Sequence, residues 1–130
     1  MESIFSKIIK GEIPSYKVAE DHNFYAFLDI NPNTLGHTLV VPKKAENKLF
    51  DLPEDEYSKL MIFSYKVAKA IEKSITCKRV GMSVIGLEVP HVHVHLIPIH
   101  EMDDMRFISK VKLTNDEFKA TAEKIASNFK

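Results

Sequence analysis

The sequence predicts an α+β domain in which a mostly antiparallel sheet carries helices. Short strand-like segments follow one another through short turns, as antiparallel strands do, and helical periodicities come at intervals between them. The chain has 130 residues, which is the length of one domain. Apolar residues make up 45% of it, as in globular chains that bury a core.

The first third of the chain is predicted to contain a short helix followed by three strands. Apolar residues recur at helical spacing over residues 3–10, and Gly11 is a natural C-terminal stop. Turn residues separate the first two strands as in a hairpin, and Pro42 ends the third. The three strands are expected over residues 16–20, 24–28 and 37–41.

The rest of the chain is predicted to hold a long helix, two strands and a last helix. Residues 53–75 begin with a proline and three acidic residues and then repeat apolar residues at spacings of three and four. Strands are expected over residues 80–85 and 91–98. Residues 114–117 form a capping box for a helix that runs to about residue 128.

Composition excludes several classes of protein. Lysine plus arginine equal aspartate plus glutamate, at 18 each, which argues against a protein that grips long nucleic acid but allows a single nucleotide to bind. Cys77 is the one cysteine, so no disulfide can form within the chain. The N-terminus has no signal-peptide core, and no apolar run approaches the ~20 residues that span a bilayer. We therefore expect a cytoplasmic protein that does not enter membranes.

Three histidines alternate with hydrophobic residues in one predicted strand. His91, His93 and His95 share a face of that strand because its side chains alternate, while Val92 and Val94 point into the core. The row can be interpreted without a function, as three unrelated histidines on an exposed face of the sheet. The two functional interpretations are a metal site and a site for chemistry at phosphorus.

Spacing argues against a single metal ion bound by the whole row. The Cα atoms of His91 and His95 lie roughly 13 Å apart on an extended strand, whereas zinc–nitrogen bonds measure about 2 Å. Phosphoryl or nucleotidyl transfer suits the row better, because a neutral imidazole is a good nucleophile towards phosphorus. A flanking histidine can bind or protonate phosphate oxygens or the leaving group. His93 touches both neighbours and is therefore the expected nucleophile.

The row and three upstream segments together resemble the histidine triad (HIT) family, and within it the Hint branch. The matching segments are residues 4–15, 26–32, 36–43 and 91–97, in the family's order. This resemblance implies a five-stranded antiparallel sheet, with sheets joined across a homodimer. It also implies one HIT domain over residues 1–130, with a core over 4–98 and a C-terminal helical segment over 99–130.

The resemblance also implies residue roles. Family members bind a nucleoside monophosphate moiety, with a lean to purines, and cleave at its α-phosphate. His93 corresponds to the residue that becomes nucleotidylated and His95 to one that contacts the phosphate, while His91 and His37 would orient His93. Asp29 would accept hydrogen bonds from the ribose hydroxyls. The remaining residues implied in nucleotide binding are Phe5, Ile8, Phe27, Leu28, Ile30, Gly86 and Glu88.

The sequence departs from the family pattern in two places. Some members hold a structural zinc ion, but three of its four ligand positions here are Ser3, Ser6 and Ala45, so we expect no metal cofactor. Before the row, the usual amide side chains are absent. Leu87 stands where a glutamine that contacts phosphate is common, and Glu88 replaces a small hydroxyl residue. Losing one such donor can cost about 10²–10³ in rate, although the backbone amides near Gly86 remain.

These features predict an enzyme of the nucleoside phosphoramidase type, which would cleave at the α-phosphate of a nucleotide conjugate through a covalent nucleotidyl-histidine. A dinucleoside polyphosphate hydrolase is the second enzymatic possibility. A nucleotide-binding regulatory module with little turnover is the third, and the changed loop before the row suggests it. Each would have a purine nucleotide or nucleotide conjugate as its ligand.

Overall fold

One five-stranded sheet forms the centre of the computed structural model, which describes residues 2–130. The strand order is β1-β2-β3-β5-β4, and every neighbouring pair is antiparallel. The strands are β1 (Lys17–Glu20), β2 (Phe24–Leu28), β3 (Thr38–Pro42), β4 (Arg79–Ser83) and β5 (Val94–Ile99). The predicted fold class is therefore confirmed.

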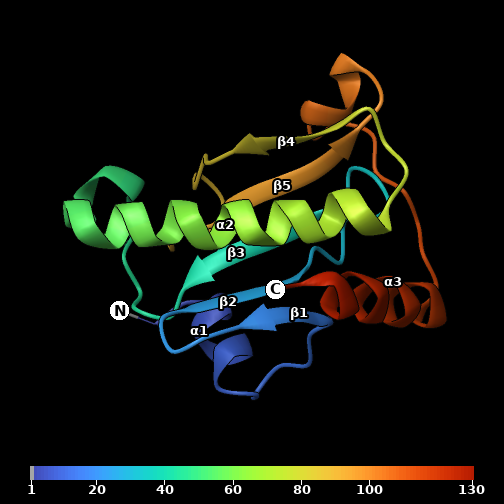
Figure 1. Ribbon diagram of the computed structural model, residues 1–130. Helices are drawn as coiled ribbons and strands as arrows, with labels where there is room; N and C mark the ends of the chain where they lie inside the picture. Colours follow the sequence, from blue (N-terminus) through green and yellow to red (C-terminus); the bar gives the residue numbers. More distant parts are fainter. Residues whose placement is uncertain (1) are drawn as a thin grey trace.

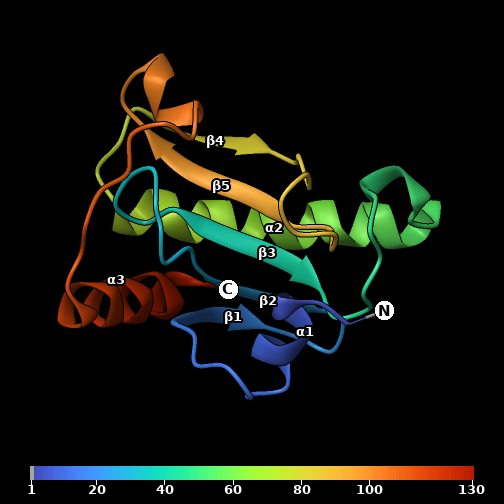
Figure 2. The ribbon, with the colours of Figure 1, turned by 180° about the vertical axis from the view of Figure 1, so that it is seen from behind.

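Helices cover the two faces of this sheet unequally. The α-helices are α1 (Ile4–Ile9), α2 (Glu54–Ser74) and α3 (Asn115–Asn128), and two short 3-10 helices are η1 (Leu49–Asp51) and η2 (Met102–Met105). The long helix α2 crosses one face of the sheet, with α3 beside it (Figure 1). On the opposite face only the short α1 lies against the strands, next to β2 (Figure 2). The face opposite α2 is therefore covered by little helical structure.

Strand alternation divides the buried residues into two clusters. On β2, Phe24, Ala26 and Leu28 join the large core beneath α2 and α3, whereas Tyr25 and Phe27 join a smaller cluster beneath α1. This follows from the period of two, which sends successive side chains to opposite faces. All five residues of β2 are buried, because both faces of this internal strand are covered.

The C-terminal segment contributes to the core. Phe118, Ala122 and Ile125 of α3 are buried in the same cluster as the residues beneath α2, and α3 packs against both α2 and β1. The hydrophobic core therefore extends beyond residues 4–98 into the segment predicted over residues 99–130. Within residues 2–130, none of the helices combines the length and the apolar character that crossing a membrane requires.

The strand that carries the histidine row begins later than predicted. It starts at Val94, and its register with β3 places Val40 beside Val94 and Leu39 beside His95. The ladder stops there because β3 ends soon after Val40, at Pro42, which has no N–H to donate. The residues before Val94 bond the loop after β3 instead of β3 itself: the N–H of Val92 donates to the carbonyl of Glu46 at 2.8 Å.

Candidate active site

Four histidine side chains are buried together on the α1 side of the sheet. The His95 ring lies at the centre, with ring-centroid distances of 4.9 Å to His93 and 5.2 Å to His37. The ring of Phe5 from α1 packs edge-on against His93 at 4.9 Å and His91 at 5.7 Å. The sequence therefore brings His37 to the row, as predicted, and α1 closes one side of it.

Hydrogen bonding fixes which nitrogen of His93 can attack. Nδ1 of His93 lies 2.7 Å from the backbone carbonyl of His91. A carbonyl oxygen only accepts, so Nδ1 carries the proton and donates it. The lone pair of neutral His93 is therefore on Nε2, for which residues 2–130 offer no hydrogen-bond partner. A free imidazole lone pair is what a nucleophile needs.

A chain of hydrogen bonds sets the tautomer of His95. The backbone N–H of Asn33 donates to Nδ1 of His37 at 2.9 Å, and burial, together with charge on His95, lowers the pKa of His37 to about 3. Neutral His37 therefore carries its proton on Nε2, which donates to Nδ1 of His95 at 3.0 Å. Burial also lowers the pKa of His95 to about 4, so neutral His95 presents an N–H at Nε2.

The direct partner of His37 is His95 and not His93. His37 and His91 were expected to form a network that orients His93, and within the row the ring of His37 bonds His95. The register explains the difference, since Leu39 pairs with His95 and His37 precedes Leu39 by two residues on the same face. The diagonal neighbour of His37 is therefore His95. The backbone carbonyl of His91 takes the role of orienting His93.

Asp29 lies at the end of β2, beside His37. Its Oδ2 is 3.6 Å from Nε2 of His37, and its Oδ1 accepts the N–H of Asn31 at 2.9 Å. Burial raises the pKa of the Asp29 carboxyl. Donor atoms of Asp29, His37 and His95 lie within 4.8 Å of one another, but the two facing histidine nitrogens already share a hydrogen bond. A metal ion here would displace the proton that sets the His95 tautomer.

A small apolar cluster that includes Phe5 lies beside His93. Phe5 and Ile8 of α1 pack with Phe27 of β2 in the cluster beneath α1. Ile30, which follows β2, is 74% exposed and is free to contact a ligand. Phe5 thus contacts the ring of His93, with Ile8 and Phe27 packed in the same cluster behind it, while Ile30 lies farther along the chain at the surface.

Leu28 is placed differently from the prediction. It was expected in a pocket for the base, but it is 2% exposed and packs in the core beneath α2. The reason is strand alternation: Phe27 points to the α1 side, so the next residue points to the other side. The side chain of Leu28 therefore faces away from the histidines.

These positions predict a loss of stability on truncating Leu28 and a loss of nucleotide binding on truncating Ile30. Leu28→Ala is expected to lower the free energy of unfolding by about 2–5 kcal/mol, because it opens a cavity in the core. Ile30→Ala is expected to change stability by less than about 0.5 kcal/mol and to weaken nucleotide binding. Urea denaturation and calorimetric titration with AMP measure the two quantities. Equal stability losses for the two variants would contradict this placement.

The loop before the row presents no side-chain donor to the histidines. Gly86 has a φ of +76°, a conformation that favours glycine. Leu87 is 90% exposed and Glu88 is exposed, although the charge of Glu88 contributes to the raised pKa of Asp29. The assignment of Gly86 and Glu88 to nucleotide binding stays a prediction.

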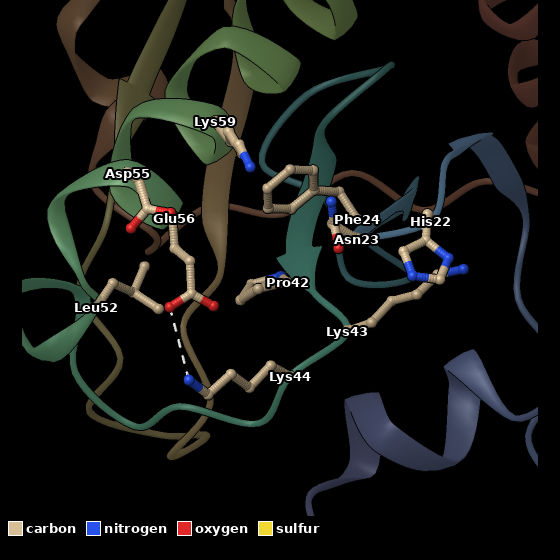
Figure 3. Close-up of a pocket in the computed structure, with 10 residues that line it drawn as sticks. All are labelled: His22, Asn23, Phe24, Pro42, Lys43, Lys44, Leu52, Asp55, Glu56 and Lys59. Atoms are coloured by element: carbon tan, nitrogen blue, oxygen red, sulfur yellow. Dashed lines mark ion pairs between the residues drawn. The ribbon is translucent and has the colours of Figure 1, made fainter.

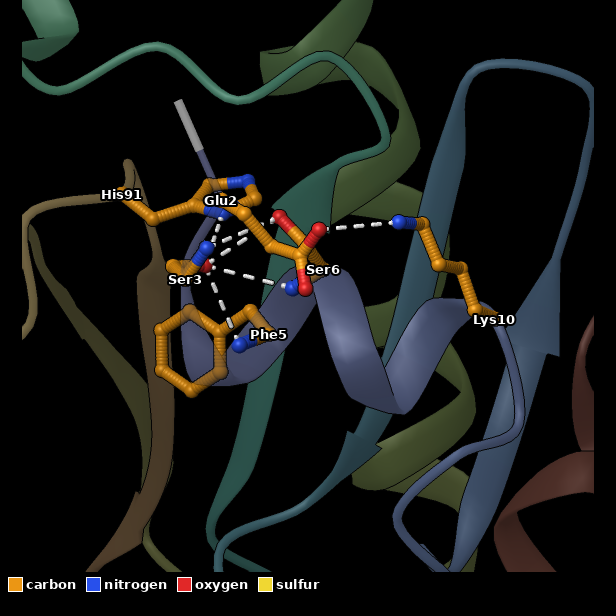
Figure 4. Close-up of polar contacts among 6 residues, drawn as sticks. All are labelled: Glu2, Ser3, Phe5, Ser6, Lys10 and His91. Atoms are coloured by element: carbon orange, nitrogen blue, oxygen red, sulfur yellow. Dashed lines mark hydrogen bonds and ion pairs between the residues drawn. The ribbon is translucent and has the colours of Figure 1, made fainter.

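Ser3 ties the N-terminus to the histidine row (Figure 4). As the N-cap of α1, its Oγ accepts the N–H groups of Phe5 at 3.1 Å and Ser6 at 3.2 Å. Nε2 of His91 lies 2.8 Å from the carbonyl of Pro42 and donates to it, so Nδ1 accepts the hydroxyl proton of Ser3 at 2.6 Å. One hydroxyl thus caps a helix and orients a histidine.

The residues present do not fit a structural zinc ion at this place. Zinc in proteins is bound by cysteine, histidine or carboxylate side chains. Ser3 and Ser6 offer hydroxyls that already bond within the cap, and Ala45 offers no donor. His91 would be the one remaining ligand, and its two ring nitrogens are already hydrogen-bonded.

Ser3→Ala is expected to lower the free energy of unfolding by about 1–3 kcal/mol. The variant loses an N-cap and leaves buried Nδ1 of His91 without a donor. Ser6→Ala is the matched control, since its hydroxyl accepts the Ser3 N–H at 3.1 Å and lies 3.5 Å from the Ser3 hydroxyl but does not contact His91, and we expect it to cost less. Urea denaturation of both variants checks the order, which a larger loss in Ser6→Ala would reverse.

Three residues of the site lay outside the predictions: Asn33, Phe107 and Lys110. The ring of Phe107 packs edge-on against His95 at 4.7 Å, and Lys110 bonds the side chain of Asn33 at 2.7 Å. No spacing pattern signals these contacts, because 77 positions separate Asn33 from Lys110. Only the path of the C-terminal segment brings them together.

A separate cavity of about 310 Å³ is lined by none of the four buried histidines. It opens between the start of α2 and the turns beside β2 and β3 (Figure 3). Charged and polar side chains of both signs line it, including His22, Lys43, Lys44, Asp55, Glu56 and Lys59. Two of them, Lys44 and Glu56, pair at 3.5 Å. None of the predicted site residues borders this cavity.

Comparison with known proteins agrees with the geometry. The family model for the HIT domain matches residues 10–102. The chain is 46% identical to the uncharacterized HIT-like protein MJ0866 of Methanocaldococcus jannaschii over 110 residues, which cover 77% of this chain and 81% of that protein. It is 34% identical to adenosine 5'-monophosphoramidase hnt1 of Schizosaccharomyces pombe over 133 aligned residues, which cover all of both chains.

Solved structures show the same likeness. A crystal structure of a Hit-like protein from Bartonella henselae, described as involved in cell-cycle regulation, has a TM-score of 0.85 and 32% identity, and the match covers 98% of this chain and 97% of that one. The sheet order, the buried histidine row and these matches lead to one conclusion: the chain belongs to the HIT domain family.

Proposed function

We propose that this protein is a nucleotide hydrolase that cleaves a purine nucleoside phosphoramidate at its α-phosphate, with His93 as the nucleophile. One observation carries the proposal: the free Nε2 lone pair of His93 stands next to a neutral His95 that presents an N–H. A relative, the S. pombe protein 34% identical over its whole length, is named an adenosine 5'-monophosphoramidase.

The first step forms a bond between Nε2 of His93 and phosphorus while the phosphorus–nitrogen bond of the substrate breaks. The departing nitrogen takes a proton from solvent and leaves as an amine. Because the pKa of His95 is lowered to about 4, we assign its N–H to hydrogen bonding with a phosphoryl oxygen rather than to proton donation. Such a donor stabilises charge that develops in the transition state.

The second step returns the enzyme to its starting state. Water attacks phosphorus and loses a proton to solvent, and the bond between phosphorus and Nε2 of His93 breaks. The nucleoside monophosphate leaves, and the lone pair is restored. Throughout both steps the carbonyl of His91 holds Nδ1–H of His93, which keeps Nε2 aimed at the same point.

The neighbouring side chains suit a nucleoside. Phe5, Ile8 and Phe27 offer apolar surface for a purine base beside the nucleophile. Oδ2 of Asp29 has no partner closer than the 3.6 Å contact with His37, which leaves it to accept a ribose hydroxyl. Neither step requires a metal ion, so we propose that the protein acts without one, either as a monomer or as the homodimer implied by the resemblance.

Turnover of a substrate panel tests the proposal. Adenosine 5'-phosphoramidate and diadenosine polyphosphates are incubated with the protein, and AMP release is followed by chromatography, with and without EDTA. We expect faster AMP release from the phosphoramidate and no effect of EDTA. Preference for the diadenosine polyphosphates would instead support a dinucleoside polyphosphate hydrolase. AMP binding without turnover of any substrate would support a regulatory module, which the absence of a side-chain donor from the loop at Leu87 favours.

A further inference from the structure

The segment between η2 and α3 folds back over the histidine row. Phe107 lies in it with a φ of +60°, the one positive value at a residue other than glycine within residues 2–130. This left-handed conformation is costly for a bulky residue and persists only where contacts hold it. Here it turns the ring edge-on against His95 at 4.7 Å and toward His37 at 6.1 Å.

Two hydrogen bonds, one from this segment and one to η2 just before it, attach this part of the chain to the loop before β3. The N–H of Val111 donates to the carbonyl of Pro32 at 3.0 Å. The side-chain amide of Asn33 donates to the carbonyl of Asp104 at 2.8 Å. The segment is therefore held against the same loop whose Asn33 N–H sets the tautomer of His37.

This attachment places the ammonium group of Lys110 at the site. Its Nζ donates to Oδ1 of Asn33 at 2.7 Å and lies 5.0 Å from the centre of the Phe107 ring. The side chain is half-buried. A lysine ammonium has three protons to donate, and residues 2–130 provide a hydrogen-bond acceptor for one of them.

No carboxylate within residues 2–130 neutralises Lys110 through a salt bridge. Its charge reaches the site: it adds to the lowering of the pKa of His37 and His95, and it opposes part of the rise that burial causes in the pKa of Asp29. No other lysine or arginine acts on the site histidines in this way among the described residues. Lys110 therefore brings a positive charge, without a salt-bridge partner within residues 2–130, to the side of the site where His37 and His95 are neutral.

We infer that Lys110 binds the phosphate of the nucleotide beside His95, an inference that rests on the proposed function. Its ammonium would donate to a non-bridging oxygen while Nε2 of His93 approaches phosphorus. It would thereby supply the donor that the loop with exposed Leu87 does not present. The ligand class that follows is a nucleoside 5'-phosphate or its conjugate, favoured over the uncharged nucleoside.

The test compares AMP with adenosine, which lacks the phosphate. Binding of each to the whole protein is measured by calorimetry or ligand-observed NMR for wild type, Lys110→Met and Lys110→Arg. Lys112→Met, an exposed lysine of the same segment, is the control that removes equal charge. We expect Lys110→Met to weaken AMP binding roughly 10- to 100-fold, the range of a hydrogen bond to a charged group, with adenosine binding unchanged.

The further variants separate phosphate binding from packing. Lys110→Arg should restore most of the AMP affinity, and Lys112→Met should match wild type. In turnover assays Lys110→Met should raise KM for the phosphoramidate. Unchanged AMP binding in Lys110→Met, or equal loss of AMP and adenosine binding, would overturn the inference.

The same experiment keeps this inference apart from the proposed hydrolysis. If wild type binds AMP through Lys110 but turns over no substrate, the hydrolase proposal fails and the phosphate site stands. If wild type hydrolyses the phosphoramidate and Lys110→Met behaves identically, the phosphate assignment fails alone. If wild type binds no AMP, both fail.

Discussion

His93→Ala should abolish nearly all turnover, with a loss in kcat of about 10⁶-fold, the size of loss found when the nucleophile of a serine protease is removed. The substitution deletes the one imidazole of the row whose Nε2 is both unprotonated and without a hydrogen-bond partner within residues 2–130. His95 cannot replace it, because its Nδ1 is occupied by His37 and its Nε2 carries a proton.

Two measurements check this prediction. Steady-state release of AMP from adenosine 5'-phosphoramidate gives kcat, and mass spectrometry of rapidly quenched protein detects the adenylyl adduct, which should be present in wild type and absent in His93→Ala. His100→Ala is the control, since His100 is exposed and bonds Asp104 through its backbone N–H, which the substitution keeps. Turnover that continues unchanged in His93→Ala would refute the covalent mechanism.

Acid should unfold this protein steeply between about pH 6 and pH 4. Burial lowers the pKa of His37 to about 3 and that of His95 to about 4, from an ordinary value of 6.5. In this range His37 and His95 bind protons in the unfolded chain but stay largely neutral in the native protein, so the free energy of unfolding falls as pH falls. Two protons correspond to about 2.7 kcal/mol per pH unit.

Two other groups modify the slope. The lowered pKa of His91 acts in the same direction. The raised pKa of Asp29 acts against it, because its native carboxyl binds a proton at a pH where the unfolded one has lost it. The pKa values of His37 and His95 are shifted most. The protein is therefore still expected to lose stability as the pH falls.

Urea denaturation at several pH values between 4.5 and 7 measures this slope. His37→Gln removes one titrating group while keeping an amide that can both accept and donate, so the slope should fall by about 1.4 kcal/mol per pH unit. His22→Gln, at an exposed position, is the matched control. A free energy of unfolding that stays constant across this range would show that the buried histidines are protonated in the native state.

Local patterns in the chain were enough to predict the elements. The alternation of histidine with valine placed His93 and His95 on the face opposite the helix-covered core, and Val94 was indeed found in that core. The capping box at Thr114 begins α3 as predicted. Such signals depend on neighbours within a few residues, so the sequence displays them directly.

Contacts between distant segments were predicted less well. His37 was expected in a network that orients His93, and the register of β3 on β5 decides that its ring reaches His95 directly. Leu28 was assigned to the base pocket, but strand alternation along β2 points its side chain into the core. The contact of His37 depends on how two strands pair, whereas the placement of Leu28 depends on the side of β2 to which Phe27 points.

The sequence by itself determined the α+β class, the histidine row and the choice of His93 as the expected nucleophile, since each depends on a short-range period or on one residue type. The tertiary structure alone decided the tautomers, which require the carbonyl of His91 and the N–H of Asn33. It also decided the place of Lys110, which reaches the site through a hydrogen bond between residues 77 positions apart. Spacing along a chain carries no information about such contacts, because they arise only when the whole core has packed.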